Sequence, residues 1–565
     1  MNITTAPKTA SPLEQPASLN ELIDIACTKY ADHKAVGMAL HEPITYREFH
    51  ARILALSAKL QEDGVQFGDR VALLAENSCN WVTAYLAVVR LGAVCVPILP
   101  DLPEADVQNI LSEMECSSIF TSKQQINKIL GLQEKISLLV TLDDYQEFGG
   151  QICSTLPFTE LLAEAQERFA ADLPEFPAVE STHTASILYT SGSSGFAKAV
   201  VLSHGNFCAN AAASARAIPL APGAVFLSIL PVSHTFEFTV GFLMPMLKGA
   251  CVCYAGKSPT PTVLKKLCRQ ERPHLILTVP LVLEKIYKKQ VLPAVKKNGI
   301  LSFLCRFSLG RRLIYRRIGK KLMAFFGGRL EMLGIGGAAL NPEVEHFLRD
   351  ARLPYLVGYG MTEASPVISG GPAGDRSISP DSAGKPLAGV EVRIEDADPT
   401  TGVGEILVRG PNVMQGYWNK PDETAKTIDG QGWLHTGDLG RIDEQGNVCV
   451  TGRSKSVIVL ANGENVYPEA IEHKLNSHAL VAEALVVERD GALVALIHPD
   501  YDLAKKQSKK QEQQTYLTAE LERIRREVNG QVGSSSRLAK VAEQQEPFIK
   551  TATHKIKRYL YAEGR

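Results

Sequence analysis

A run of hydroxyl and glycine residues between two apolar segments is the first part of the sequence whose residue types could do chemistry. It lies within SILYTSGSSGFAKAVVLSH, residues 186–204. Glycine adopts positive φ readily, and small hydroxyl side chains add donors without blocking an approach, so the N–H groups of such a loop can surround an anion. A phosphate is therefore the candidate ligand of this loop, which comprises Thr190, Ser191, Gly192, Ser193, Ser194, Gly195 and the following Lys198. Taken alone, the same composition also agrees with an ordinary surface turn.

This loop differs from a Walker A loop. A Walker A loop places Gly-Lys-Ser/Thr at the start of a helix. Here Phe196 and Ala197 separate Gly195 from Lys198, and a β-branched run follows. The sequence therefore excludes a P-loop nucleoside triphosphatase.

Four further stretches place polar or charged side chains beside glycines or apolar runs. They are LPVSHTFE (230–237), GYGMTEASP (358–366), GWLHTGDLGRID (432–443) with TGRSKSVIVLANGENVYPEAIE (451–472), and FIKTATHKIKR (548–558). Together with the glycine-rich loop, their order and spacing resemble the adenylate-forming (AMP-binding) superfamily, which includes acyl-CoA synthetases, 4-coumarate ligases, luciferases and peptide-synthetase adenylation domains. The resemblance extends from about Asn20 to the C-terminus. SHTFE, GYGMTEASPVIS and GENVYPEAIE make the chain most similar to long-chain fatty-acid CoA ligases.

The resemblance implies an acid–thiol ligase that activates a medium- or long-chain fatty acid. The acid would react with ATP to give acyl-AMP and diphosphate, and the acyl group would then pass to coenzyme A. The expected cofactors are therefore ATP, Mg²⁺ and coenzyme A. By resemblance, Lys198 and the glycine-rich loop hold the β- and γ-phosphates. Glu363 is the expected Mg²⁺ ligand, and Thr362 would contact the α-phosphate or the acyl carboxylate.

The same resemblance implies a set of nucleoside-binding residues. Tyr359 would offer a flat face to adenine, Asp438 would accept both ribose hydroxyls, and Arg453 would add a donor. The stretch GGAAL, residues 336–340, would let the backbone lie close to the nucleotide and the acyl group. The further residues expected at this site are Gly336, Gly337, Ala338, Gly360 and Met361.

Two lysines are expected to take part in a domain movement. Lys555 matches the mobile catalytic lysine of the family and would neutralise charge between the carboxylate and the α-phosphate. Lys455 matches the hinge about which the small C-terminal domain rotates, so that the loop 461–472 replaces Lys555 and helps to form the pantetheine channel. The chain departs from the family at His554, where glycine is usual, and at Ser456, where many relatives carry an acid.

The apolar stretch that begins near residue 230 is expected to surround the acyl chain. By resemblance, His234 matches the position that flanks the acyl pocket, and we expect it to be a catalytic residue. The residues expected to line an apolar tunnel are Phe236, Phe238, Phe242, Leu243 and Met246. Each buried methylene contributes about 0.8 kcal/mol, so the length of the tunnel would set the preference for chain length.

Three alternative functions remain open. The acyl group could pass to acyl-carrier protein instead of coenzyme A. A luciferase-like oxygenase would act on its own adenylate and consume oxygen. A binding protein that has lost catalysis is disfavoured, because the lysines and carboxylates named above are all present.

The elements that must position these residues follow an α/β pattern. Short apolar runs such as VALLA, VCVPIL and SILYT alternate with longer helix-like segments such as WVTAYLAVVRLGA and PTVLKKLCRQ. Beyond about Asp381, short strands separated by glycine turns predict a small β-rich subdomain. We therefore predict a flexible tail (1–19), a large N-terminal α/β domain (20–452) and a small, mobile C-terminal α+β lid domain (453–565).

The overall composition excludes some classes of partner. Sixty Lys and Arg residues against 61 Asp and Glu residues give a formal charge of -1, which does not favour nucleic acid. The eleven cysteines show neither zinc-site nor disulfide spacing, and the N-terminal residues do not resemble a signal peptide. The most apolar region is interrupted too often to span a membrane. These features predict a cytoplasmic protein.

Residues 285–330 carry the strongest charge asymmetry of the chain. They contain thirteen Lys or Arg residues and no Asp or Glu, interleaved with apolar residues. Such a segment can lie on anionic lipid. Peripheral contact with the inner face of a membrane, docking of coenzyme A phosphates or an acidic carrier protein, and a merely solvated basic face all agree with this composition.

Overall fold

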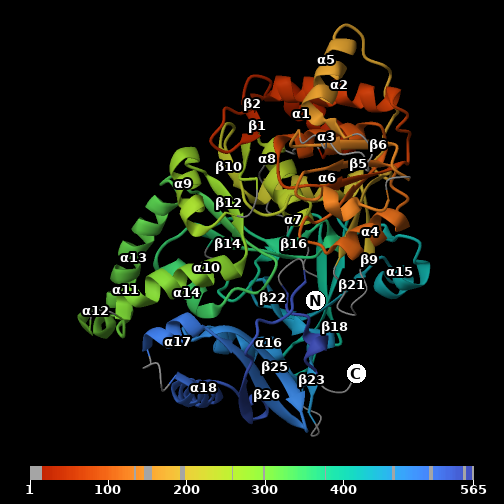
Figure 1. The fold of residues 1–565 in the computed structure, drawn as a ribbon. Helices are drawn as coiled ribbons and strands as arrows, with labels where there is room; N and C mark the ends of the chain where they lie inside the picture. The colour runs from red at the N-terminus through yellow and green to blue at the C-terminus, as the bar shows by residue number, and fades with distance from the viewer. Residues whose placement is uncertain are drawn as a thin grey trace.

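The computed structural model shows two parts, an upper α/β part and a smaller C-terminal part below it (Figure 1). The structure describes residues 15–132, 135–144, 155–190, 198–256, 259–296, 299–375, 377–460, 465–507, 513–551 and 555–562. Within these ranges, no helix combines the length and the hydrophobicity that a membrane-spanning segment needs.

Among the described residues, one large sheet has eight strands, and its central strands are parallel. β9 is the exception near one edge, because it pairs antiparallel with both β8 and β20. In sheet order the strands are β20 (Gly416–Tyr417), β9 (Lys198–Ser203), β8 (Thr184–Thr190), β4 (Val94–Pro97), β3 (Arg70–Leu74), β5 (Ser118–Thr121), β6 (Leu138–Thr141) and β7 (Leu156–Pro157).

A second large sheet has seven strands in the described ranges and is parallel except at β2. Its order is β14 (Tyr355–Val357), β13 (Met332–Ile335), β12 (Leu275–Thr278), β10 (Val225–Ser228), β11 (Cys251–Tyr254), β1 (Lys34–Met38) and β2 (Ile44–Thr45). Cys251 and Cys253 are buried on the same face of β11.

Alternate residues of the two sheets belong to different hydrophobic cores, as the two-residue repeat of a strand requires. In β3, Val71 and Leu73 face the first core, whereas Ala72 and Leu74 face another core on the opposite side. The first core lies between the two sheets and also contains residues of several helices, among them α1 (Leu19–Lys29), α2 (Tyr46–Glu62), α3 (Cys79–Arg90) and α6 (His204–Ala217). Other helices cover the outer faces, among them α4 (Glu104–Glu113), α9 (Pro261–Glu271), α10 (Pro280–Ile286), α13 (Ser308–Phe325) and α14 (Pro342–Asp350). Strands buried on both faces explain the continuous apolar runs, and the predicted α/β fold class is confirmed.

The predicted N-terminal tail (1–19) extends too far along the chain, because its last residues are folded. Ser18 is buried and caps α1 by accepting a hydrogen bond from the Glu21 N–H, and Leu19 is fully buried. Leu19 begins the amphipathic pattern of this helix, so it belongs to the folded domain rather than to a tail.

The smaller units are a β-rich subdomain and the C-terminal domain. The subdomain is a four-stranded antiparallel sheet of β18 (Glu391–Glu395), β19 (Gly404–Arg409), β21 (Leu434–Ile442) and β22 (Val448–Arg453). The C-terminal domain packs α16 (Pro468–Asn476), α17 (Tyr501–Gln507) and α18 (Gln513–Asn529) with a sheet of β25 (Val481–Arg489), β26 (Ala492–Pro499) and β27 (Lys540–Glu543). The exact domain boundaries remain predictions.

Side chains of the upper part donate hydrogen bonds to the backbone of the C-terminal domain. The side-chain amide of Asn341 donates to the carbonyl oxygen of His473 at 2.9 Å. The ammonium of Lys288 donates to the carbonyl oxygen of Val481 at 3.1 Å. In this structure the C-terminal domain is therefore docked beside the residues that follow α10 and the residue that precedes α14.

Candidate active site

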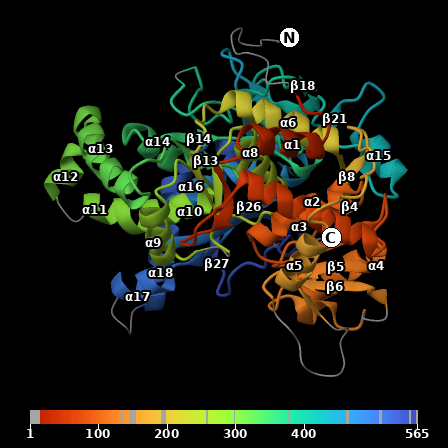
Figure 2. The same ribbon diagram turned by 90° about the horizontal axis from the view of Figure 1, so that it is seen from above.

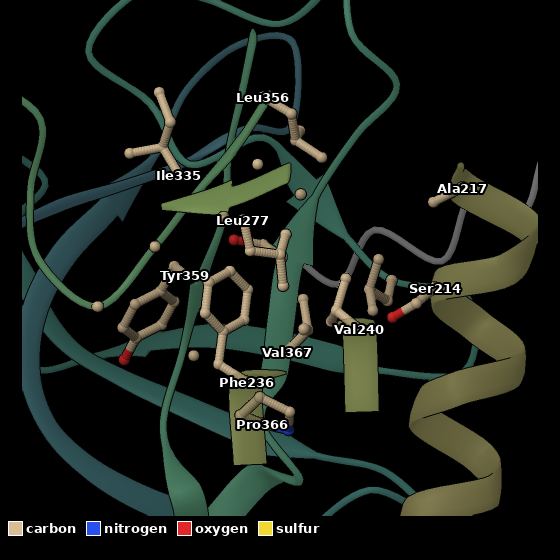
Figure 3. A pocket seen from close by; sticks show the side chains of 18 of the residues that line it. Ser214, Ala217, Phe236, Val240, Leu277, Ile335, Leu356, Tyr359, Pro366 and Val367 are labelled. Carbon is tan, nitrogen blue, oxygen red and sulfur yellow. The ribbon is translucent and has the colours of Figure 1, made fainter. Parts of the chain in front are cut away.

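A pocket that is partly open to solvent brings together residues from several of the predicted motifs. Seven predicted site residues line it: His234, Gly336, Gly337, Tyr359, Gly360, Met361 and Thr362. Figure 3 shows Tyr359 at one end of the pocket and Ser214 and Ala217 of α6 at the other. The motifs that are far apart in the sequence thus meet at one cavity.

Two glycines of this pocket lie close to neighbouring residues. A Cβ atom on Gly336 would come within 2.9 Å of the ring of Phe236, and one on Gly360 would lie 2.0 Å from the carbonyl oxygen of Pro366. Any side chain at these positions would displace the pocket wall. Gly336 and Gly360 therefore set how closely the backbone passes the cavity.

The described pocket lining carries no carboxylate, ammonium or guanidinium group. Among the lining residues, His234 is the one whose side chain could become charged. Burial lowers its pKa to about 4, and the positive charge of Lys555 also acts to lower it. Its Nδ1 accepts a hydrogen bond from the N–H of Phe236 at 3.2 Å, which leaves the proton of the neutral ring on Nε2. At neutral pH the lining is therefore uncharged and suited to an apolar group.

The predicted tunnel is only partly correct. Phe236 and Val240, four residues apart, lie on the helix face that lines the pocket. Phe238 and Phe242 lie on the opposite face, where Phe238 packs against the rings of Tyr85 and Phe207. Leu243 and Met246 are likewise fully buried in the core between the sheets. Four of the five residues assigned to the tunnel thus stabilise the domain and do not line the pocket.

Glu363 and Lys198 are connected through Tyr417. The hydroxyl of Tyr417 donates to Oε1 of Glu363 at 3.1 Å, and the ammonium of Lys198 lies 4.5 Å from the centre of the Tyr417 ring. Lys198 also forms an ion pair of 3.1 Å with Glu423. Burial raises the pKa of the Glu363 carboxyl, and the Tyr417 hydrogen bond and the charge of Lys198 oppose that rise. The predicted metal ligand and phosphate lysine therefore share one electrostatic environment.

Asp438 is held by two of the predicted nucleoside-binding residues. The hydroxyl of Tyr359 donates to its Oδ2 at 2.8 Å, and Nε of Arg453 lies 3.0 Å from its Oδ1. Asp438 and Arg453 are directly opposite each other in β21 and β22. Each carboxylate oxygen has two acceptor positions, so both oxygens retain capacity for a further donor.

A second carboxylate fixes the backbone of β21 just before Asp438. Oε1 of Glu405 accepts a hydrogen bond from the N–H of Gly437 at 2.9 Å, and Oε2 lies 3.3 Å from Nδ1 of His435. Gly437 has φ of 68°, a conformation that favours glycine. This part of β21 is therefore anchored to β19 of the subdomain sheet.

Lys555 lies within electrostatic range of this cluster although it belongs to the C-terminal domain. Although the Lys555 side chain is largely exposed, the surrounding protein partly desolvates its ammonium and lowers its pKa. The charge of Arg453 lowers this pKa further, and the carboxylates of Asp438 and Glu363 oppose both effects. The pKa of His234 also responds to the charge of Lys555. The docked C-terminal domain thus places a cation from a distant part of the chain within electrostatic range of Asp438, Glu363 and His234.

The segment around Lys555 is braced by the rest of its domain. Thr551 donates its N–H to the carbonyl oxygen of Lys555 at 2.8 Å, and Lys550 pairs with Ile556 in an antiparallel bridge. Three residues after Lys555, the guanidinium of Arg558 donates two hydrogen bonds of 2.8 Å to the carboxylate of Glu472 in α16. These contacts orient the lysine relative to the domain.

Several predicted residues lie elsewhere or outside the described residues. Ser191, Gly192, Ser193, Ser194 and Gly195 fall outside them, as do His554 and the first four positions of the loop 461–472. Thr190 and Lys198 face each other in β8 and β9 at the base of the glycine-rich loop. Ala338 is exposed and does not line the pocket. Lys455 is exposed in a single 3₁₀ turn that directly follows β22.

Sequence analysis missed Tyr417 and Glu423. Both belong to GYWNKPDET, residues 416–424, and Glu423 lies 225 positions from Lys198. The aromatic and acidic residues that lie close together in this stretch could have indicated a functional segment. The contact of this stretch with Lys198 depends on the antiparallel pairing of β20 with β9, and local sequence patterns do not predict such a pairing.

Comparison with known proteins agrees with this arrangement. Residues 23–418 match the AMP-binding enzyme family, and residues 455–563 match the AMP-binding enzyme C-terminal domain. The chain is 29% identical over 526 residues to the peroxisomal long chain acyl-CoA synthetase 7 of Arabidopsis thaliana, covering 85% of this chain and 73% of the relative. It is also 29% identical to the medium-chain fatty-acid–CoA ligase of Escherichia coli, covering 81% and 78% of the two chains.

A solved structure has the same fold. The anthranilate CoA ligase AuaEII in complex with anthranoyl-AMP superposes with a TM-score of 0.78 at 20% identity, covering 97% of each chain. The family match spans well over half of the sequence and includes every motif that lines the pocket. The chain therefore belongs to the family of AMP-binding enzymes.

Proposed function

We propose that this enzyme activates a medium- or long-chain fatty acid with ATP and transfers the acyl group to coenzyme A. The observation that carries the proposal is the uncharged, largely apolar pocket, which is lined by Thr362 and ends beside Tyr359. An apolar chain gains free energy on entering such a cavity, whereas an amino acid would leave its ammonium without a partner. The names of the similar enzymes support the same class of substrate.

In the first step the fatty carboxylate attacks the α-phosphorus of ATP. A carboxylate oxygen forms a bond to phosphorus, the bond from the α-phosphorus to the bridging oxygen breaks, and diphosphate leaves with the electron pair. Lys555 reduces the repulsion between the two anions, and Lys198 stabilises the departing diphosphate. Both roles need cations at the cleft, and both ammonium groups lie within electrostatic range of Glu363.

Glu363 is the residue that would hold Mg²⁺. Its buried carboxylate receives a hydrogen bond from the neutral hydroxyl of Tyr417, so its charge is available to a hard cation that prefers few protein carboxylates. The bound ion would neutralise charge on the phosphates. Asp438 would accept the ribose hydroxyls while Tyr359 and Arg453 hold its carboxylate in place.

In the second step the sulfur of coenzyme A attacks the acyl carbonyl carbon. The bond from that carbon to the phosphate oxygen breaks, AMP leaves, and the thiol proton passes to solvent. The sulfur needs access to the face that Lys555 occupies, so the C-terminal domain rotates about Lys455. The interdomain hydrogen bonds of Lys288 and Asn341 would break in that rotation.

Diphosphate release measured across a panel of carboxylic acids tests the proposed function. Acids from octanoate to oleate should each release diphosphate from ATP in the presence of Mg²⁺, and added coenzyme A should give the thioester. Acetate and amino acids should be poor substrates. Release with amino acids alone would refute the fatty-acid assignment. A thioester formed on acyl-carrier protein and not on coenzyme A would refute the assigned acceptor.

A further inference from the structure

Exposed apolar side chains are concentrated at one end of the basic segment. Fifteen large hydrophobic side chains are strongly exposed among the described residues, and five of them fall within residues 303–313. These are Phe303, Leu304, Phe307, Leu309 and Leu313, and Leu309 is 71% exposed. They occupy the end of α12 (Gly299–Leu304) and the beginning of α13. We call residues 303–324 the α12–α13 tip.

The tip is a protruding surface and not a groove. α12 and the beginning of α13 lie at the outer edge of the molecule in both ribbon views (Figures 1 and 2). The rings of Phe303 and Phe307 contact each other edge to face at 5.5 Å. A Cβ atom on Gly310 would lie 2.4 Å from the carbonyl oxygen of Leu304, so the turn between the two helices is tight.

The opposite face of α13 is fixed to the domain. A Cβ atom on Gly319 would lie 2.4 Å from the carbonyl oxygen of Ala351, which shows how closely α13 passes the end of α14. Leu322 and Phe326 are buried in the second core. Because this inner face is occupied, the outer face of α13 must point to solvent along its whole length.

The outer face is cationic. Arg306, Arg317, Lys320 and Lys321 are all exposed, and no acidic residue occurs between positions 285 and 330. Asp350 of α14 compensates part of the charge, because it pairs with Arg311 and Arg312. The remaining cations extend along α13 from the apolar end of the tip, so one surface combines an apolar end with a basic flank.

We propose that the α12–α13 tip binds an anionic lipid bilayer. The apolar side chains would enter the boundary between headgroups and acyl chains, and the lysines and arginines would contact anionic headgroups. A free anion such as coenzyme A would neutralise the cations but leave the phenylalanine and leucine side chains in water. A bilayer satisfies both parts of the surface at once and accommodates a convex tip. This inference does not depend on the proposed reaction.

Flotation of the purified full chain with phosphatidylcholine vesicles, with and without phosphatidylglycerol, tests the proposal. We expect binding to the anionic vesicles only, and weaker binding at high salt. The double variant Lys320→Glu, Lys321→Glu should reduce the partition coefficient at least about tenfold, since each cation near an anionic surface contributes about fivefold. Its matched control is Lys505→Glu, Lys506→Glu, which changes an exposed lysine pair of α17 by the same charge and should bind like the parent.

An apolar variant separates insertion from attraction by charge alone. Leu309→Ser with Leu313→Ser should weaken vesicle binding severalfold, and Leu40→Ser with Leu173→Ser, at two other exposed leucines, should not. The proposal is overturned if the parent floats with neither vesicle, or if the control variants lose as much binding as the tip variants. Binding of coenzyme A or of an acidic carrier protein that the Lys320 and Lys321 variant weakens, without vesicle binding by the parent, would also overturn it.

Discussion

The hydroxyl of Tyr417 donates a hydrogen bond of 3.1 Å to the carboxylate of Glu363. The same ring carries the ammonium of Lys198 against its face, so one aromatic residue contacts both the proposed metal ligand and the proposed phosphate lysine. Tyr417 comes from β20, which pairs with the strand that begins at Lys198. The position of Glu363 is thereby linked to the base of the glycine-rich loop.

Tyr417→Phe should weaken Mg²⁺ binding at Glu363 while it keeps the aromatic ring that contacts the Lys198 ammonium. Loss of the hydrogen bond removes an effect that holds down the pKa of Glu363, so that pKa should rise further and the acid limb of the pH profile for adenylation should move to higher pH. A hydrogen bond to a charged group contributes about 1.5–3 kcal/mol, so the Mg²⁺ concentration for half-maximal rate should rise about tenfold or more. The control is Tyr189→Phe, which removes a tyrosine hydroxyl that donates to Glu113 and not to Glu363. An unchanged Mg²⁺ requirement in Tyr417→Phe would contradict the link.

Asp438→Ala should abolish discrimination between ATP and 2′-deoxy-ATP. The parent should have a higher kcat/KM for ATP than for 2′-deoxy-ATP, because the buried carboxylate can accept a hydrogen bond from each ribose hydroxyl. In the variant the two nucleotides should have similar kcat/KM values, with a raised KM for ATP. Glu444→Ala, an exposed acid in the turn between β21 and β22, should behave like the parent. If Asp438→Ala keeps the parental preference for ATP, another residue binds the ribose.

Arg558→Lys should slow the adenylation step more than the thioester step. Lysine keeps the positive charge but cannot make the two hydrogen bonds that Arg558 donates to Glu472, so the segment that carries Lys555 loses orientation. A small displacement of a catalytic group can cost about a hundredfold, and we expect a decrease of about ten- to a hundredfold in diphosphate release. Thioester formation from supplied acyl-AMP should change little. Arg523→Lys, in an ion pair on the surface of α18, is the control. Equal loss in both half-reactions would indicate a structural role instead.

Ala217→Phe should shift the enzyme toward shorter acids. Ala217 lines the end of the pocket away from Tyr359, so a phenyl ring there would occupy the space of the chain terminus (Figure 3). Each methylene that no longer fits costs about 0.8 kcal/mol, about fourfold in kcat/KM. Arg216→Phe changes the adjacent exposed residue and should leave the preference unchanged. If the long acids retain their parental kcat/KM in Ala217→Phe, the acyl chain takes a different path.

The pocket residues could be predicted because they occur in compact motifs. Tyr359, Gly360, Met361 and Thr362 are consecutive, and a short segment folds with its residues together. The α/β fold could also be predicted, since strands buried on both faces produce continuous apolar runs.

Two features could not be predicted, for different physical reasons. The stretch 236–246 is apolar on every side, so sequence alone does not distinguish the face of Phe236 that lines the pocket from the face of Phe238 that packs in the core. The contact of Tyr417 with Lys198 depends on strand pairing between distant segments, for which no local pattern exists.

The role of Lys555 is the central claim, and a single-turnover measurement of acid-dependent diphosphate release tests it most directly. Lys555→Met should lower the rate about 10²–10³-fold, as loss of one preorganised electrostatic contact does, while Lys557→Met in the same segment should remain close to the parent. The Lys555 variant should still form thioester from supplied acyl-AMP and coenzyme A at the parental rate. Diphosphate release by Lys555→Met at the parental rate would contradict the account.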